Sequence, residues 1–443
     1  MGNVFGSSNE GGQTPSFSYY SGLFTLKKTK CQDYLMSRSS DEGETAQILE
    51  PGTTAILRHK SVVSEMESYC QRWASGDIYR GNDIGPLRLN SKCKIWEDMS
   101  PPYVTLGTTV EKHAKFRPLM DKACEPGKDW DEFTILNHAT KYLKTDIIDT
   151  ASGGRGSLRI KKDVSNWTCM LLHKVMLNID MTAAEAESFT NMQEQLLKII
   201  ILPDFLLSFG CVSNYKLKLQ EVREWRKLKI SEFEDVLSKQ YDQFTNKEDL
   251  HFAAVGFLDT ITMNIIAVTT GIHSSLAVLY SSKSPKPKEL QINEENLPAF
   301  LWEVLRLYVP LSAVPYYNGP DQKQRKLLLM TSASRDPEVW GEDANEFRLR
   351  DLSQYRELSV LWGEKMVDKE DSRNNHVCPA KDLSYQMMLN FLKAFLRIKS
   401  QILVEESVKD ITILPEINAG GKSLHLSEWE FGTTVQQEQE LIR

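Results

Sequence analysis

The stretch Asn374-Asn375-His376-Val377-Cys378-Pro379-Ala380-Lys381-Asp382 decides how the rest of the chain is interpreted. Its cysteine lies between a loop and a helix predicted from Pro379 to about Lys399, where apolar residues recur at three- and four-residue steps. Proline suits the first turn of a helix, and the unpaired N–H groups of that turn favour a negative charge. Cys378 is therefore either a thiolate that acts as a nucleophile or metal ligand, or a buried structural cysteine.

The composition is that of a globular protein. The chain has 443 residues, of which 41% are hydrophobic and 26% charged, and a formal net charge of −7. This charge argues against nucleic acid as a partner, because phosphate binding needs a basic face. The seven cysteines include no CxxC pair, so neither a disulfide framework nor a zinc site is indicated. With no secretory signal or membrane-spanning pattern, we expect a cytoplasmic protein with at most a peripheral membrane contact.

The periodicity predicts a mainly α fold with small β-sheets, of the α+β class. Residues 1–45 are rich in Gly, Ser, Asn and Glu and are predicted to be mobile. Helices are predicted at 62–73, 108–120, 131–143, 167–177, 182–201, 217–228, 231–243, 250–279, 293–309 and 379–399. Strands are predicted at 53–59, 311–317 and 326–331, with a closing hairpin at 411–414 and 423–431.

Two of these helices carry polar residues in apolar surroundings. Glu303 and Arg306 are three residues apart among leucines and a tryptophan, which favours a bidentate ion pair inside the fold. The helix at 250–279 is apolar nearly all round, so it should run through the core. Asp259 and Thr260 lie inside it, and they are either bonded back to the helix or form a polar notch that faces a ligand.

The helix at 108–120 carries a short basic motif. His113 and Arg117 are four residues apart and share one face, whereas Lys115 lies on another face and is expected to point to solvent. From these residues alone, a solvated basic face is the simplest interpretation.

Together these segments resemble the haem-thiolate enzymes of the cytochrome P-450 superfamily. The resemblance covers about residues 100–400, and it implies a single haem-thiolate catalytic domain over residues 46–443 with a long central helix over a haem b. Four elements carry it in the expected order: the propionate-binding helix with His113, Lys115 and Arg117, the ExxR helix with Glu303 and Arg306, the aromatic meander from Asp336-Pro337 to Trp340, and the ligand loop with His376 and Cys378.

The ligand loop departs from the usual pattern of that superfamily. Where most members have Phe, Gly and Gly around the cysteine, this chain has Asp371, Asn374 and Ala380. Asn375 and the Lys381-Asp382 pair are instead similar to the branch that metabolises fatty acid hydroperoxides. That branch includes allene oxide synthases, hydroperoxide lyases, epoxyalcohol synthases and divinyl ether synthases.

The resemblance implies roles for individual residues. Cys378 would be the axial iron ligand, with His113, Lys115, Arg117 and His376 around the haem. Glu303 and Arg306 would be structural. Asp259 or Thr260, with Ser312, would orient the hydroperoxide of a polyunsaturated fatty acid, whose O–O bond the ferric iron splits homolytically without O₂ or NADPH.

Two other functions remain open from the sequence. A monooxygenase supplied by a reductase is favoured by the Asp259-Thr260 pair, which resembles a proton-relay motif, but opposed by Phe257 and by the ligand loop. The hydroperoxide branch has an asparagine in its central helix, and no gap-free alignment places one here. The third possibility is a haem-binding protein without turnover.

Overall fold

The computed structural model describes residues 46–50, 53–79, 109–125, 130–151, 156–201, 213–241, 244, 246–280, 284–310, 313–318 and 324–404. The predicted mobile segment at 1–45, the predicted hairpin at 411–431 and Ser312 lie outside the described residues.

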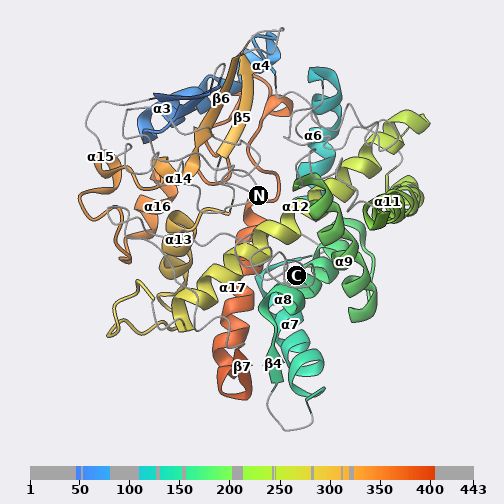
Figure 1. The fold of residues 1–443 in the computed structure, drawn as a ribbon, viewed down its shortest axis with the longest axis vertical. Coiled ribbons are helices and arrows are strands. Elements are labelled where there is room, and N and C mark those ends of the chain that lie inside the picture. Colours follow the sequence, from blue (N-terminus) through green and yellow to red (C-terminus); the bar gives the residue numbers. More distant parts are fainter. Residues whose placement is uncertain are drawn as a thin grey trace.

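Helices dominate the fold, which confirms the predicted class (Figure 1). The central helix α12 (Lys247–Tyr280) runs diagonally through the helical part in Figure 1, and α17 (Lys381–Ile398) passes beside it. The other α-helices are α3 (His59–Glu67), α4 (Tyr69–Ala74), α6 (Val110–Cys124), α7 (Glu132–Tyr142), α8 (Ile160–Leu177), α9 (Ala183–Ile201), α11 (Ser213–Gln240), α13 (Leu297–Leu307), α14 (Met330–Ala333), α15 (Pro337–Trp340) and α16 (Leu352–Leu358).

Two small sheets complete the described part. The larger has the strand order β1-β2-β6-β5-β3, made by β1 (Ala46–Glu50), β2 (Thr53–Ile56), β6 (Gln324–Leu329), β5 (Ala313–Asn318) and β3 (Ile78–Tyr79). In it β2 and β6 are parallel, and β5 and β6 form an antiparallel pair with Val314 opposite Leu328. The smaller sheet pairs β4 (Gly156–Leu158) in parallel with β7 (Ile402–Val404). The strands predicted at 311–317 and 326–331 are confirmed to within two residues at each end.

Helix α12 lies in the core because it has no polar face to turn outward. By length and composition alone it could cross a membrane, but 78% of its most apolar window is buried inside the fold. The main apolar core surrounds it, and a second core lies beneath the larger sheet, where α3 and α4 pack. The prediction of a buried core helix at 250–279 is confirmed.

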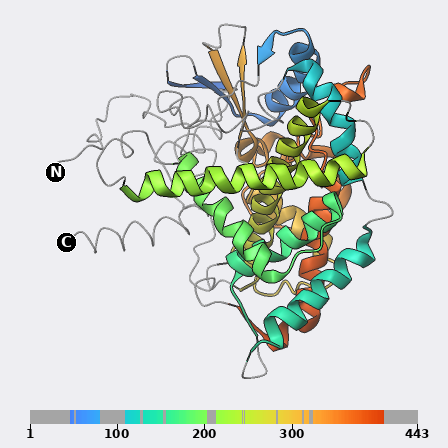
Figure 2. The same ribbon diagram turned by 90° about the vertical axis from the view of Figure 1, so that its right-hand side faces the viewer.

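Helix α11 (Ser213–Gln240) differs from the sequence prediction. Two helices were predicted at 217–228 and 231–243, yet one uninterrupted helix of 28 residues is present. Figure 2 shows it lengthwise, crossing the molecule in lime green. The intervening Lys229-Ile230 contains no glycine or proline, and the buried positions continue across it at steps of three or four: Val222, Arg226, Ile230, Phe233 and Leu237.

Candidate active site

The Cys378 loop is one side of a short hairpin. The Cys378 N–H donates to the carbonyl of Trp362 at 2.8 Å, and the His376 N–H donates to the carbonyl of Met366 at 3.0 Å. Gly363 allows the return of the chain, because it adopts a φ of 68° that other residues rarely accept. The Cys378 carbonyl then accepts from the N–H of Lys381 at 3.2 Å, where α17 begins. The backbone thus fixes the cysteine directly before the helix.

Burial decides the protonation of Cys378. It raises the pKa of the thiol to about 11, while the Ala380 N–H and the positive charge of Arg117 act in the opposite direction. The helix-end effect predicted from the sequence is therefore present, but it is weaker than desolvation. A metal cation on the sulfur would be needed to hold a thiolate there at neutral pH.

Helix α6 clamps this loop from one side. Arg117 donates through Nη1 to the carbonyls of Asn375, at 2.9 Å, and Val377, and its Nε donates to Asp121 at 2.9 Å. His113 Nδ1 lies 3.0 Å from the carbonyl of Arg373, in the same loop. One turn of α6 therefore holds both ends of the segment that leads to Cys378.

Two imidazoles stack beside the loop. The rings of His113 and His376 lie 4.4 Å apart with an interplanar angle of 23°, and the indole of Trp73 packs edge-on against both. Tyr69 contacts His376 at 5.0 Å in the same manner. Both histidines are buried. The structure thus brings His113 and His376 together next to Cys378.

Lys115 is not part of this group. Its side chain is 65% exposed, and its ammonium pairs with Asp249 at the start of α12 at 2.5 Å. The prediction that its side chain points to solvent is confirmed.

One face of α12 looks towards α6 and α17. Gly256, Thr260 and Asn264 are spaced by four residues and lie on this face. A Cβ on Gly256 would overlap the ring of Phe116 in α6, and Asn264 Oδ1 accepts from Ser384 Oγ of α17 at 2.8 Å. Thr260 is buried, and its hydroxyl has no hydrogen-bond partner among the residues that the structure describes.

Asp259 points elsewhere. Its carboxylate accepts from Arg226 Nη1 of α11 at 2.8 Å, and each of the two side chains is 4% exposed. Next to this pair, Gln193 of α9 donates to the carbonyl of Thr262 at 2.7 Å. Successive helical residues are about 100° apart, so the acid and the alcohol of the Asp259-Thr260 pair face different neighbours. The pair does not form the single polar notch considered from the sequence.

Sequence reasoning missed Arg226 and Asn264. The sequence could have indicated that Arg226 is buried, because it occupies a position in the apolar stripe of α11 where a hydrophobic residue would be expected. The sequence indicated Asn264 less clearly, since it is marked only by its place one turn after Thr260.

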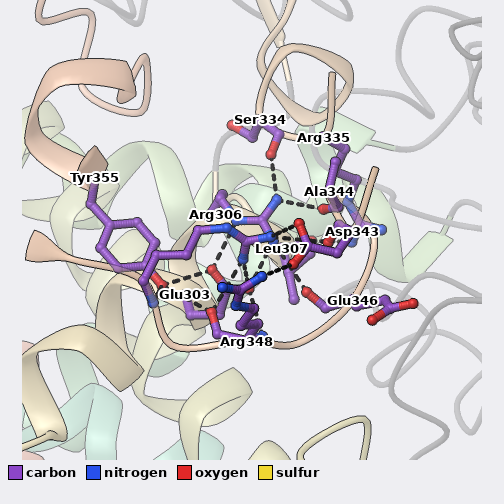
Figure 3. Close-up of polar contacts among 11 residues, drawn as sticks. Glu303, Arg306, Leu307, Ser334, Arg335, Asp343, Ala344, Glu346, Arg348 and Tyr355 are labelled. Atoms are coloured by element: carbon purple, nitrogen blue, oxygen red, sulfur yellow. Dashed lines mark hydrogen bonds and ion pairs between the residues drawn. The ribbon is translucent and has the colours of Figure 1, made fainter. Parts of the chain in front are cut away.

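Glu303 and Arg306 form the bidentate pair that their spacing predicts (Figure 3). Arg306 donates to Glu303 through Nε at 2.9 Å and through Nη2 at 2.7 Å, and both residues are buried. Arg350 Nη1 and the Tyr355 hydroxyl also donate to the Glu303 carboxylate, at 2.7 and 2.9 Å. The free side of Arg306 donates to the carbonyls of Ser334 and Ala344.

This network reaches the cysteine loop through aromatic rings. Trp302, next to Glu303, contacts the ring of Trp362 edge-on at 5.3 Å. The carbonyl of Trp362 is the one that accepts from Cys378. Glu303 and Arg306 are thus linked to the loop through Trp302 and Trp362.

By sequence, the chain matches no protein-family model and no curated protein. By structure, it is similar to solved cytochromes P-450. The myxobacterial cytochrome CYP267B1 in complex with myristic acid matches with a TM-score of 0.58 at 12% identity, over 83% of this chain and 88% of that one. CYP109E1 from Bacillus megaterium in complex with corticosterone matches with a TM-score of 0.56 at 15% identity, over 84% and 91%. Epothilone D-bound cytochrome P450epoK matches with a TM-score of 0.54 at 16% identity, over 81% and 87%. The chain has the cytochrome P-450 fold, as the resemblance implied.

Proposed function

We propose that this protein is a haem-thiolate enzyme that converts fatty acid hydroperoxides without O₂ or NADPH. The observation that carries the proposal is the hairpin that presents a single cysteine before α17, clamped by Arg117. Asn375 and the Lys381-Asp382 pair of this loop resemble the hydroperoxide branch. The product would be an epoxyalcohol, an allene oxide or a pair of chain-cleavage fragments.

The residues around Cys378 fit a haem. Among the described residues no three His, Cys, Asp or Glu side chains gather to hold a metal ion. Cys378 would therefore be the one protein ligand in this region, which suits a metal that brings its other ligands in a macrocycle. The stacked His113 and His376 would lie beside the propionates, and Arg117 would position the loop. When bound, such a haem would supply the iron that cleaves the peroxide bond.

The carboxylate of Asp259 is bound by Arg226 on another face of α12, so Thr260 is the residue of this pair that we propose to orient the substrate. A hydroperoxide already contains its O–O bond, so the chain has only to orient it. The buried hydroxyl of Thr260 can donate or accept one hydrogen bond to that group. Ser312, outside the described residues, stays a prediction for the same task.

A lipid substrate is consistent with two of the similar structures. Their ligands are myristic acid in CYP267B1 and a hexadec-9Z-enoic acid carried on an acyl carrier protein in another cytochrome P-450. In those proteins the fold accommodates a long acyl chain. Helix α12 of this chain is long and mostly apolar.

The test is incubation of the purified, haem-loaded protein with a linoleate hydroperoxide and no reductant. We expect loss of the conjugated-diene absorbance and formation of a defined product. The variant Cys378→Ala should lose thiolate ligation in the spectrum of the ferrous carbonyl complex, and with it the turnover. The matched control is Cys70→Ala, a buried cysteine of the second core, which should retain both.

Two outcomes would contradict the proposal. Turnover that requires NADPH and a reductase would make the protein a monooxygenase. A haem spectrum without turnover of any fatty acid hydroperoxide would make it a non-catalytic haem protein.

A further inference from the structure

A thiol, an imidazole and a thioether meet near the C-terminal end of α8. This helix carries none of the candidate active-site residues. Cys169 and His173 are four residues apart and share one face of this helix, and Met181 follows in the segment before α9. Cys169 Sγ lies 3.6 Å from His173 Nδ1 and 4.0 Å from Met181 Sδ. A thiol, an imidazole and a thioether are the side chains that soft metal ions prefer.

The two distances from Cys169 Sγ can be compared with those of a trigonal site. In protein metal centres, bonds to sulfur are about 2.3 Å long and bonds to imidazole nitrogen about 2.0–2.1 Å. At angles of 120° such bonds separate two sulfur ligands by about 4.0 Å, and a sulfur from a nitrogen by about 3.8 Å. Both distances from Cys169 Sγ lie within about 0.2 Å of these values.

The surroundings favour a soft cation of low charge. Cys169 and His173 are buried, and the rings of Phe189 and Phe233 pack edge-on against the imidazole at 4.8 and 5.7 Å. Met181 is partly exposed and offers a path of entry from the surface. Lys229, whose charge acts on both Cys169 and His173, pairs with Glu232 at 2.6 Å.

We propose that Cys169, His173 and Met181 form a binding site for copper(I). The reaction is an exchange without electron transfer, in which the Cys169 thiol loses its proton to solvent and its sulfur bonds to the cation. The imidazole must then carry its proton on Nε2, because Nδ1 would bind the metal in place of its present contact with the Cys169 carbonyl at 2.8 Å. The thioether selects copper(I) over zinc, which takes thiolate, imidazole and carboxylate ligands.

Another use of the same atoms is purely structural. A buried thiol beside a buried imidazole satisfies itself, and methionine sulfur packs well against both. That arrangement would hold no cation. The two possibilities differ in whether Cys169, His173 and Met181 together bind a metal ion.

The experiment is an anaerobic competition for copper(I) between the full-length, haem-loaded protein and bicinchoninate, whose copper(I) complex is coloured. We expect the protein to retain one equivalent. Changing a residue that only supports a metal ligand typically lowers metal affinity by about 10–100-fold. Loss of a proposed ligand itself, in Met181→Leu, should therefore lower the affinity for copper(I) at least about tenfold. Met176→Leu, a buried methionine on the same helix, is the matched control and should leave the affinity unchanged.

A second measurement keeps the test independent of the stability of any variant. X-ray absorption at the copper edge of the wild-type protein should show two sulfur ligands and one nitrogen ligand. The proposal is overturned if copper(I) is not retained, if Met181→Leu binds it as tightly as Met176→Leu does, or if the spectrum shows sulfur ligands alone. The last result would indicate adventitious binding by other cysteines.

Discussion

The Glu303–Arg306 network and the Asp259–Thr260 segment are both short polar motifs in apolar helices, yet they behave differently. Residues three apart on a helix lie on the same face, so Glu303 and Arg306 form their pair within α13 itself. Adjacent residues face different directions, so Asp259 contacts α11 while Thr260 faces α6 and α17. A motif read along the sequence is therefore informative when its spacing matches the helix, and misleading when it does not.

The largest effect is expected from Glu303→Gln. This change keeps the size of the side chain but leaves Arg306 and Arg350 buried without their carboxylate, and breaking a buried ion pair typically costs about 3–5 kcal/mol. We expect a protein that unfolds at much lower denaturant concentration or fails to fold. The milder Tyr355→Phe removes one hydrogen bond to the same carboxylate and should cost about 1–3 kcal/mol.

The control for this prediction is Glu338→Gln. Glu338 is 52% exposed and pairs with Lys60 at 3.6 Å, so its loss should change the free energy of unfolding by less than about 1 kcal/mol. Equal effects at Glu303 and Glu338 would show that the buried network is not what holds α13 in place.

A smaller effect is expected from Arg226→Met, which leaves Asp259 buried beside an apolar side chain. Because one hydrogen bond joins this pair, we expect the free energy of unfolding to fall by about 3 kcal/mol, the lower limit for broken buried ion pairs. The double variant Arg226→Met with Asp259→Leu should regain most of it, since both charges are then gone. Denaturant unfolding of the two single variants and the double variant measures the coupling, and simple additivity would contradict it.

Acid should also weaken α12, through His273. Burial lowers the pKa of this histidine to about 4, below the value of about 6.5 for an unfolded chain. Between these pH values the unfolded state binds a proton that the folded state does not, so stability falls as the pH falls from 6.5 to 4 and this contribution then levels off. The loss is on the order of 3 kcal/mol. Unfolding curves across this range should have a shallower pH dependence in His273→Asn than in the wild type, and an unchanged slope would contradict the prediction.

The smallest effect on stability, and a large one on activity, is expected from Thr260→Val. The hydroxyl has no hydrogen-bond partner in the described part of the chain, so its loss should change the free energy of unfolding by less than about 1 kcal/mol. If it orients the hydroperoxide, kcat/KM should fall by about tenfold or more, because one such hydrogen bond is worth about 1–2 kcal/mol.

The matched control is Thr262→Val. Thr262 is also buried in α12 without a partner for its hydroxyl among the described residues, but its backbone carbonyl binds Gln193 of α9. This variant should keep the wild-type turnover. A fall in turnover of equal size in both variants would assign the effect to the helix and not to the Thr260 hydroxyl.

The elements of the fold followed from the sequence wherever periodicity was clear. The core helices, the paired strands β5 and β6 and the Glu303–Arg306 pair depend on local spacing, which a sequence contains. The capping box at Thr182 and Glu185 is another such feature, with reciprocal hydrogen bonds of 2.8 and 3.2 Å. In α11 the buried stripe continues past Lys229 through Ile230, so the predicted break between two helices was wrong.

The candidate site was harder, because its geometry depends on contacts between distant segments. Spacing on α6 predicted that His113 and Arg117 share a face, but it did not predict that Arg117 would bind loop carbonyls. Likewise, the helix end beside Cys378 was visible in the sequence, whereas the degree of burial that raises the pKa of the thiol depends on the whole fold.

The contact between Arg117 and the cysteine loop also bears on how the protein is made. The residues that it joins are about 260 positions apart, and α6 leaves the ribosome long before the loop exists. At a synthesis rate of about 5–20 residues per second, α6 waits on the order of ten seconds or more for its partner. The cysteine loop therefore closes well after α6 has been made, and any cofactor held between them would have to join a chain that already contains both segments.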